Sequence, residues 1–292
     1  MSLIKILNIK NQAFIPAYKF FLRFRKNKLG FIGLLLVTLF ILISIFAPII
    51  SPYEPTKTNT GPVFMSPNAQ FIMGTDNLGR DVFSGVIFGI RISIQVGVFA
   101  ALTAATIGTL IGATSGFLGG AVDSILMRMT ELFLSIPTLI AAIVIVAIFG
   151  ASRLNVILVI GILSWPSIAR VIRAEFLSLR EKEFVEAARG IGQTRISIML
   201  SEILPNTIHI ILITASLQIP AAIIVEAGLS FLGLGDPQPR SLGLILNDAY
   251  PFLRRSWWSA VYPGLILSLI ALSFNVMGDG LNDALNPYLK DK

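Results

Sequence analysis

Long intervals without a charged residue constrain this sequence more than any other feature. Six intervals contain no Asp, Glu, Lys or Arg: 29–53, 92–122, 132–152, 154–169, 203–225 and 256–278. The hydrocarbon core of a bilayer is crossed by roughly 20 consecutive apolar residues in a helix. Charged residues make up 13% of the chain, whereas about 25% is usual for a soluble protein. We therefore predict an all-α integral membrane protein with six transmembrane helices.

The intervals divide the chain into a leading part and a core. We predict a basic arm over 1–28, a first span over 29–50 and an external loop over 51–84. The core, 85–292, contains the other five spans, which start near residues 84, 123, 153, 205 and 259. A loop over 180–205 and an external segment over 228–256, rich in Gly and Pro, separate the later spans.

The distribution of positive charge predicts the orientation of the chain. The first 30 residues, the loop 170–195 and the tail together carry 15 Lys and Arg, and the opposite loops carry six. Basic residues accumulate in cytoplasmic loops, so both termini and the 180–205 loop are predicted to be cytoplasmic. Arg254 and Arg255 run against this rule. Topology and attraction to anionic lipid explain the net charge of +7 without nucleic acid.

Sequence motifs that are typical of catalytic sites are missing from the chain. The chain contains no cysteine, no G-x-x-x-x-G-K-[ST] phosphate loop and no H-E-x-x-H motif, which are the usual signatures of thiolate sites, nucleotide sites and zinc hydrolases. His209 is the only histidine, and we expect a packing role for it. We predict that the chain is not an enzyme and holds no metal or cofactor.

Glycines recur at every fourth position of the second predicted span. They are Gly108, Gly112, Gly116 and Gly120. Small residues at this spacing let two membrane helices approach closely, so a close helix contact is expected. The last two glycines could instead form the turn into the third span.

A charged, helix-patterned segment lies between the fourth and fifth spans. Its first part has an apolar stripe of Phe184, Ala187, Ala188 and Ile191, and its second part a stripe of Ile196, Met199, Leu200 and Ile203. The glycines at 190 and 192 interrupt the helix, and Thr194 fits the N-cap of a second one. The pattern predicts helix, glycine turn, helix, either resting on the membrane surface or docking to a soluble partner.

This segment resembles the EAA loop of ABC-importer permeases, written EAA-x3-G-x9-I-x-LP. The matching residues are Glu186, Ala187, Ala188, Gly192, Leu204 and Pro205. One position departs from the pattern, since Glu202 stands where the family has Ile. The blocks Gly74–Gly97, Glu226–Gly243 and Trp257–Pro287 are similar to the C-type permease subunit of dipeptide, oligopeptide and nickel importers.

The resemblance implies a type I ABC importer permease fold in the cell membrane. It implies a homologous second permease subunit, an extracellular substrate-binding protein and two cytoplasmic ATPase subunits, which would bind ATP and Mg²⁺. The coupling contact to the ATPase would be made by Glu186, Ala187, Ala188, Arg189, Gly190 and Gly192. The expected substrate is a peptide, and nickel or a metal chelate is the alternative. A channel or a secondary transporter is the alternative from another class.

Three charged residues lie near or inside predicted spans: Arg91, Glu131 and Glu226. Ionisable residues at such positions often serve function. The alternative is a structural pair that joins helices or anchors a loop, and we expect this for Glu226, which opens one of the family blocks.

Overall fold

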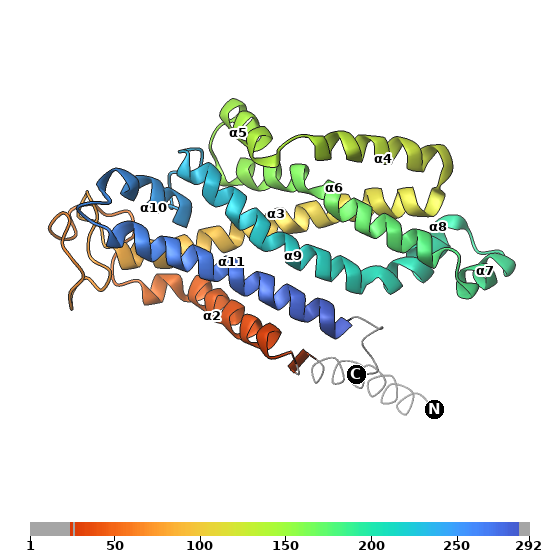
Figure 1. The fold of residues 1–292 in the computed structure, drawn as a ribbon, viewed down its shortest axis with the longest axis horizontal. Coiled ribbons are helices and arrows are strands. Elements are labelled where there is room, and N and C mark those ends of the chain that lie inside the picture. Colours follow the sequence, from red (N-terminus) through yellow and green to blue (C-terminus); the bar gives the residue numbers. More distant parts are fainter. Residues whose placement is uncertain (1–23, 26, 286–292) are drawn as a thin grey trace.

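The fold is an elongated bundle of long helices, seen in a computed structural model that describes residues 24–25 and 27–285 (Figure 1). The predicted basic arm lies almost wholly outside these residues. The helices are α2 (Lys28–Ile50), α3 (Val82–Leu118), α4 (Gly120–Ser135), α5 (Thr138–Phe149), α6 (Arg153–Leu179), α7 (Glu183–Gly190), α8 (Arg195–Ser197), α9 (Leu204–Phe231), α10 (Leu242–Ala249) and α11 (Trp258–Leu285). A π-helical turn (Ile198–Ile203) joins α8 to α9, and a 3₁₀ turn (Tyr250–Phe252) follows α10.

Five helices in the described part of the chain are long and apolar enough to cross a membrane. They are α2, α3, α6, the continuous helix 195–231 and α11. Their outer faces expose large apolar side chains, such as Leu29 at 69% and Leu110 at 64%, as a lipid environment requires. A sixth span arises if the bent pair of α4 and α5 is counted as one. The six predicted spans are therefore present as helices.

The third span differs from the prediction of one helix over Asp123–Phe149. The axes of α4 and α5 meet at an angle of 86°. Pro137 has no N–H to donate, and it disfavours a helical conformation in Ile136, which is extended with φ −92° and ψ 124°. The span is therefore broken at this proline, and the charge interval showed only that the segment was long enough.

The helix α3 lies at the centre of the bundle and packs against α2, α6 and α9. It has 37 residues, and at 1.5 Å per residue this is roughly 55 Å, longer than the hydrocarbon core. Gly119 and Gly120, with φ of +68° and +56°, form the turn into α4. Gly120 therefore belongs to the turn and not to the glycine ladder.

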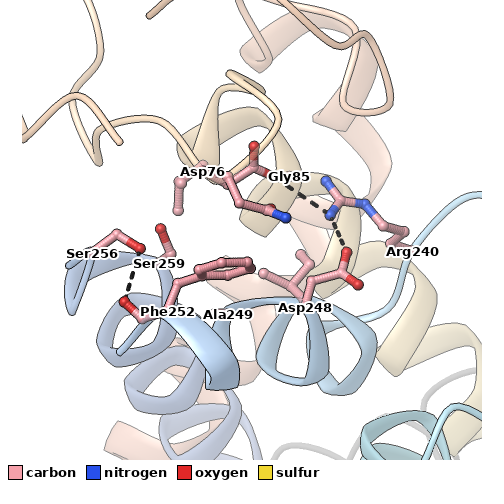
Figure 2. A pocket seen from close by; sticks show the side chains of 11 residues that line it. Asp76, Gly85, Arg240, Asp248, Ala249, Phe252, Ser256 and Ser259 are labelled. Carbon is pink, nitrogen blue, oxygen red and sulfur yellow. Dashed lines mark hydrogen bonds and ion pairs between the residues drawn. The ribbon is translucent and has the colours of Figure 1, made fainter. Parts of the chain in front are cut away.

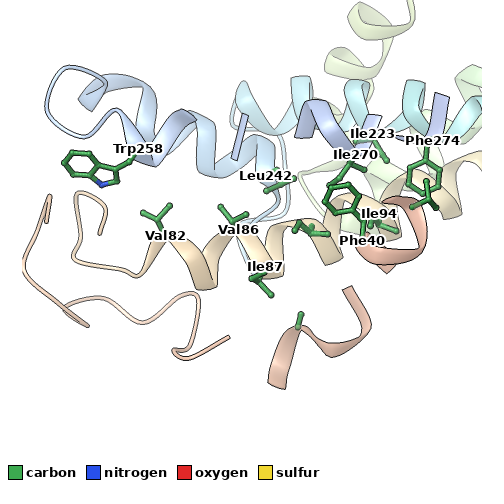
Figure 3. Packing of buried hydrophobic residues seen from close by; sticks show 13 residues of the cluster. Phe40, Val82, Val86, Ile87, Ile94, Ile223, Leu242, Trp258, Ile270 and Phe274 are labelled. Atoms are coloured by element: carbon green, nitrogen blue, oxygen red, sulfur yellow. The ribbon is translucent and has the colours of Figure 1, made fainter. Parts of the chain in front are cut away.

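Three apolar clusters hold the long helices together. The first, at the junction of α2, α3 and α11, includes Phe40, Val86, Ile270 and Phe274 (Figure 3). In this junction α2 and α11 touch through glycine, since a Cβ on Gly30 would lie 2.6 Å from the Cα of Gly280. The second cluster joins α3, α6, α7 and α9, and the third joins α3, α5, α6 and α9. Every cluster includes α3, which makes it the common support.

The two ends of the bundle differ in construction. One end, here the long-loop end, carries residues 51–81 and 232–257. The other end, here the α7 end, carries α7 and α8 beyond the ends of α6 and α9 (Figure 1). Segments that were predicted to be external therefore gather at one end, and the charged 180–205 loop lies at the other.

Single-cysteine labelling tests the predicted orientation, because the chain contains no cysteine. Lys57 and Arg189 are both exposed, at opposite ends. We expect a membrane-impermeant maleimide to label Lys57→Cys in intact cells, and to label Arg189→Cys only after permeabilisation. Arg240→Cys should react slowly, since Arg240 is 8% exposed despite its place at the long-loop end. Labelling of position 189 in intact cells would reverse the orientation.

Candidate functional site

The charged 180–205 loop forms a short helix, a glycine turn and the start of a long helix. The helix α7 ends at Gly190, and Gly192 has φ +81°, a conformation that favours glycine. The chain then turns, with the Gly192 and Gln193 amides donating to the carbonyls of Arg189 and Ala188. Thr194 caps the next helix by accepting a hydrogen bond from the Ser197 amide at 3.3 Å.

The helix after the turn does not end at Pro205. It runs without a break from Arg195 to Phe231, and Pro205 lies directly after the π-helical turn, at the start of the regular α-helical hydrogen bonding of α9. The predicted second helix of the loop is thus the beginning of the fifth span. A movement of the glycine turn would be passed directly to a membrane-crossing helix.

Only Ala188 of the apolar stripe predicted for α7 lies on the buried face of that helix. Val185 and Ala188 are the buried residues, at 0% and 6% exposed, and they pack in the cluster of α3, α6 and α9. Phe184 and Ile191 are 38% and 78% exposed, and Ala187 is exposed too. A two-turn helix has room for two apolar faces, and only one of them is covered by this chain.

The second predicted stripe is correct at only some of its positions. Ile203 is fully buried and Met199 is half-buried, but Ile196 and Leu200 are 68% and 52% exposed, and Ile198, which lies outside the predicted stripe, is 1% exposed. Ile198 and Ile203 are five residues apart and delimit the π-helical turn, in which hydrogen bonds run from i to i+5. The predicted stripe assumed 3.6 residues per turn, which this segment does not have.

The exposed side of α7 carries unpaired charge. Glu186 and Arg189 are both exposed and form no ion pair among the described residues. A Cβ on Gly190 or on Gly192 would meet no atom within 4 Å. Beside this surface lies a concave space of about 530 Å³, lined by Arg180, Glu181, Arg189, Gln193 and Arg195 with Phe117, Leu118 and Ile198. The turn and its charges are therefore open to a partner.

The predicted glycine ladder is the contact between α3 and α6. A Cβ would lie 2.9 Å from the Trp165 carbonyl oxygen at Gly108, 2.5 Å from that of Ala169 at Gly112, and 2.7 Å from that of Arg173 at Gly116. Atoms do not approach a real Cβ this closely, so the two backbones are in direct contact. The spacing predicted a close helix contact at these glycines, and in the structure α6 lies against them.

Polar contacts extend the α3–α6 contact toward the α7 end. The Arg173 guanidinium of α6 makes two hydrogen bonds to the Asp123 carboxylate of α4, at 2.5 and 2.6 Å. Ser115 of α3 also donates to Asp123, and Arg180 donates to the carbonyl of Gly116 at 3.2 Å. A paired, doubly hydrogen-bonded Arg–carboxylate contact is geometrically specific, so α3, α4 and α6 form one unit here.

The three charges near spans occupy different environments. Arg91 of α3 is half-buried and has no ion pair among the described residues. Glu131 pairs with Arg128 of its own helix at 3.4 Å, with both side chains more than 60% exposed, and such a pair contributes little. Glu226 is 2% exposed. These charges are not brought together, and only Glu226 has a built surrounding.

Glu226 accepts hydrogen bonds from two serines on different helices. The hydroxyl of Ser230, one turn later in α9, donates to Oε1 at 2.6 Å, and that of Ser93 in α3 donates to Oε2 at 3.2 Å. Around it the chain folds back on α9, since a Cβ on Gly243 would lie 2.4 Å from the carbonyl oxygen of Ala227. The Glu226 carboxylate thus links α9 to α3 beside this fold-back, and its role as an anchor of the following segment stays a prediction.

Sequence reasoning missed a cluster of buried charges at the long-loop end. Arg80 contacts Asp76 at 2.6 Å and Asp248 at 3.1 Å, and Arg240 contacts Asp248 at 2.8 Å and Asp76 at 3.8 Å. Arg240 also donates to the Pro55 carbonyl at 3.2 Å. Figure 2 shows Asp248 and Arg240 facing each other across the space between the loops. The cluster joins the 51–81 loop to α10.

The surroundings of this cluster are dry enough to affect its charges. Burial, and next the neighbouring Arg80 cation, lower the pKa of the Arg240 guanidinium, and the two aspartates counteract this shift. The Trp258 indole donates to the Thr75 carbonyl at 3.1 Å and fixes the same loop to α11. The sequence blocks Gly74–Gly97, Glu226–Gly243 and Trp257–Pro287 thus meet at the long-loop end. The charged residues in the loops were the feature of the sequence that could have indicated this cluster.

The family model described as "binding-protein-dependent transport system inner membrane component" matches residues 108–291. A second, the N-terminal TM domain of oligopeptide transport permease C, matches 16–74. The chain is 39% identical to a dipeptide transport system permease protein, DppC, of Alkalihalophilus pseudofirmus, over 94% of this chain and 91% of the relative. It is 38% identical to an oligopeptide transport system permease protein, OppC, of Bacillus subtilis, over 92% and 88%.

Two further comparisons add breadth and fold. A glutathione transport system permease protein, GsiD, of Escherichia coli is 39% identical over 96% of this chain and 93% of its own length. A chain of the MetNI methionine ABC transporter, solved in inward-facing conformations, superposes with a TM-score of 0.57 at 17% identity. The superposition covers 69% of this chain and 97% of that chain, and it shows a shared fold.

The α3–α6 contact predicts a steep dependence on side-chain size at Gly112. Gly112→Ala and Gly112→Leu should both separate the helices, because the Ala169 carbonyl oxygen would be 2.5 Å from the new Cβ. Overpacking costs on the order of 1–3 kcal/mol, so thermal stability in detergent should fall. Gly264→Ala is the matched control, since its nearest neighbour is a side-chain carbon at 3.7 Å. Equal melting temperatures for all variants would contradict the close contact.

The surroundings of Glu226 predict a difference between two near-isosteric changes. Glu226→Leu leaves the Ser93 and Ser230 hydroxyls without their acceptor, at a cost of about 1–3 kcal/mol for buried polar groups. Glu226→Gln keeps one acceptor oxygen and should lose less stability. Thermal unfolding of the purified protein measures the difference, and limited proteolysis of the 232–257 segment should increase for the leucine variant alone. Identical behaviour of the two variants would rule out the anchoring role.

Proposed function

Because this chain belongs to the family of binding-protein-dependent transport system inner membrane components, we propose that it is the transmembrane permease subunit of an ATP-driven importer for peptides. The observation that supports this most directly is the α7 loop, an exposed, charged turn that is continuous with a membrane-crossing helix. A channel or secondary transporter needs no such element. The chain itself has no phosphate loop, so nucleotide hydrolysis is assigned to other subunits.

The names of the relatives support a peptide as the substrate. Those described above are named for dipeptides, oligopeptides and glutathione, and the second family model is that of an oligopeptide permease. These names favour peptides over the nickel or metal-chelate alternative. Among the described residues no group of three or more His, Cys, Asp and Glu could hold a metal ion.

The partners follow from the two ends of the bundle. The α7 end faces the cytoplasm in this proposal and docks one of two ATPase subunits, which bind ATP and Mg²⁺. The long-loop end faces outward and receives substrate from an extracellular binding protein. A homologous second permease subunit supplies the other half of the translocation path. ATP binding would favour one of the two access states by its differential affinity for them.

The two faces of α7 have different roles in the proposed coupling. The exposed face, with Phe184, Ala187 and Ile191, offers apolar area to the ATPase, and Glu186 and Arg189 offer charges. The covered face, with Val185 and Ala188, packs on the cluster that joins α3, α6 and α9. Ala188 therefore supports the loop from within, whereas Glu186 and Ala187 meet the partner. Force on α7 would reach three membrane helices through a packed contact.

A groove on α6 is our candidate for part of the path wall. It holds about 440 Å³ and is lined by Ser167, Arg170, Val171, Ala174, Glu175 and Ile210. Polar residues in membrane segments usually face a cavity or another helix and not lipid. This face of α6 is uncovered in the single chain, so we assign it to the translocation path or to the second permease subunit.

The glycine turn provides a controlled test of the coupling loop. Gly190→Ala and Gly192→Ala introduce the same methyl group into open space, but only Gly192 has positive φ, at +81°. A left-handed conformation costs a non-glycine residue about 1–2 kcal/mol, so Gly192→Ala should distort the turn, and Gly192→Val should distort it more. In reconstituted vesicles, uptake and substrate-stimulated ATP hydrolysis should fall for Gly192→Ala and remain normal for Gly190→Ala. Similar values for the two would remove the turn from the mechanism.

Glu186 tests the charge of the docking surface. An exposed ion pair contributes under about 1 kcal/mol, but reversing a charge that is desolvated at an interface costs several. Glu186→Lys should therefore reduce copurification of the ATPase subunits, or leave them bound and uncoupled. Glu54→Lys makes the same change on an exposed residue at the opposite end and should leave copurification unchanged. Full uptake by Glu186→Lys would favour a loop that rests on the membrane surface.

A further inference from the structure

The long-loop end carries exposed positive charge that is not neutralised within the chain. Two arginines, Arg254 and Arg255, stand next to the start of α11, where basic residues on the outer side oppose the usual rule for membrane insertion. Arg254 has no hydrogen-bond or ion-pair partner for its side chain among the described residues. Arg255 stacks on the ring of Phe64, 4.5 Å from its centroid, and no acid in the described part of the chain pairs with it.

The acids at this end are already engaged. Asp76 and Asp248 bind Arg80 and Arg240, Asp81 accepts from Ser84 at the start of α3, and Asp236 lies 3.9 Å from Arg153. The exposed charges that remain in the described loops are Glu54, Lys57, Arg254 and Arg255. The end therefore presents a net positive surface, and it is concentrated at the adjacent arginines.

Aromatic and apolar side chains surround these arginines. Tyr250 is 63% exposed, Trp257 is 52% exposed and Leu253 is 39% exposed. We call Tyr250, Leu253, Arg254, Arg255 and Trp257 the basic patch. Tyr, Trp and Arg are the residues that contribute most often to binding energy at protein interfaces. The composition of the basic patch is thus that of a protein-binding surface, with a defined sign of charge.

The basic patch rests on a rigid support. The amides of Arg255 and Ser256 both donate to the Phe252 carbonyl at 2.9 Å, and Phe252 packs on Phe64 with ring centroids 5.3 Å apart. The buried charge cluster and the Trp258–Thr75 hydrogen bond hold the loops beneath it. Since ordering a surface before binding reduces the entropic cost of association, this support suits a docking platform.

From these observations we propose that the basic patch docks an acidic face of the extracellular binding protein. The inference rests on the proposed function and specifies the chemistry of that one contact. Opposite charges across an interface chiefly raise the rate of association and set the orientation of the partners. The unpaired arginines would in this way steer the loaded binding protein onto the outer mouth of the path.

The test uses the complete importer in nanodiscs that contain only phosphatidylcholine, so that anionic lipid is absent. The probe is the binding protein that stimulates ATP hydrolysis by the wild-type complex, and its association is followed by surface plasmon resonance. Arg254→Glu should slow association several-fold, and the double variant Arg254→Glu/Arg255→Glu at least tenfold, at 0.1 M salt, where the Debye length is about 10 Å. The difference should shrink at 1 M salt, where that length is about 3 Å.

Lys57→Glu is the charge-matched control, because Lys57 is exposed at the same end and lies outside the basic patch. It should change association far less than Arg254→Glu. The inference is overturned if the double variant binds like the wild type, or if Lys57→Glu weakens binding as much. It is also overturned if the arginine variants bind normally here and differ only in membranes that contain anionic lipid, which would make the patch a lipid contact.

The same experiment separates this inference from the proposed function. If the wild-type complex retains ATPase subunits and responds to the binding protein while the double variant still binds normally, the inference alone is wrong. If the wild type neither retains ATPase subunits nor responds to any binding protein, the proposed function is wrong and the inference falls with it. A melting temperature for Arg254→Glu equal to that of the wild type shows that the variant is folded.

Discussion

The direct contact between the backbones of α3 and α6 is the constraint on which the rest of the structure depends. Three glycines bring carbonyl oxygens of α6 within 2.9 Å of where a side chain would start on α3. In a membrane, helices gain little from excluding lipid, so close packing and polar contacts must hold them together. All three apolar clusters include residues of α3. With α3 and α6 locked, the other helices have a fixed surface on which to pack.

This contact also explains how the α7 end is organised. Arg173, whose carbonyl faces Gly116, makes the paired hydrogen bonds to Asp123 with its side chain. One residue therefore contributes to both the backbone contact and the ion pair with α4. The covered face of α7 packs onto the same helices. The 180–205 loop is thus supported by a unit of α3, α4 and α6 that is joined by backbone contact, apolar packing and paired hydrogen bonds.

The sequence predicted the number of spans well because bilayer thickness sets a length that charge intervals reveal. It predicted the glycine contact and the turn after α7 because each rests on a local backbone requirement. The break at Pro137 was visible as a proline, but hydropathy measures length and carries no information on the 86° bend. The apolar stripe after Thr194 was misassigned at Ile196 and Leu200, because the periodicity template assumed an α-helix where the chain forms a π-helical turn.

The charge cluster at the long-loop end shows why long-range pairing escapes such reasoning. Arg80 and Asp248 are 168 residues apart in the chain, and no periodicity relates them. Single-sequence patterns report neighbours within a few turns, so a pair that depends on the fold of two loops leaves no local trace. The sequence did contain the charged residues themselves, in segments that had been predicted only as loops. The external loops of so apolar a chain contain few charged residues, so a partner can be sought for each of them in turn.

The two ends of the molecule differ in which charged residues have partners within the chain. At the long-loop end Asp76, Asp236 and Asp248 have ion-pair partners and Glu54 and Asp81 accept hydrogen bonds, and the exposed charges without an ionic partner are mainly basic. At the α7 end Glu186 and Arg189 are both unmatched, and they stand on a face that also exposes Phe184 and Ile191. A buried charge without a partner would be costly, and the buried Arg80 and Arg240 are both paired with aspartates. The exposed charges without an ionic partner differ in sign between the two ends: they are mainly basic at the long-loop end and mixed at the α7 end. In the proposed function the subunit binds a different partner at each end. The difference in charge helps each end to reject the wrong partner, because a wrong pairing would bring like charges together.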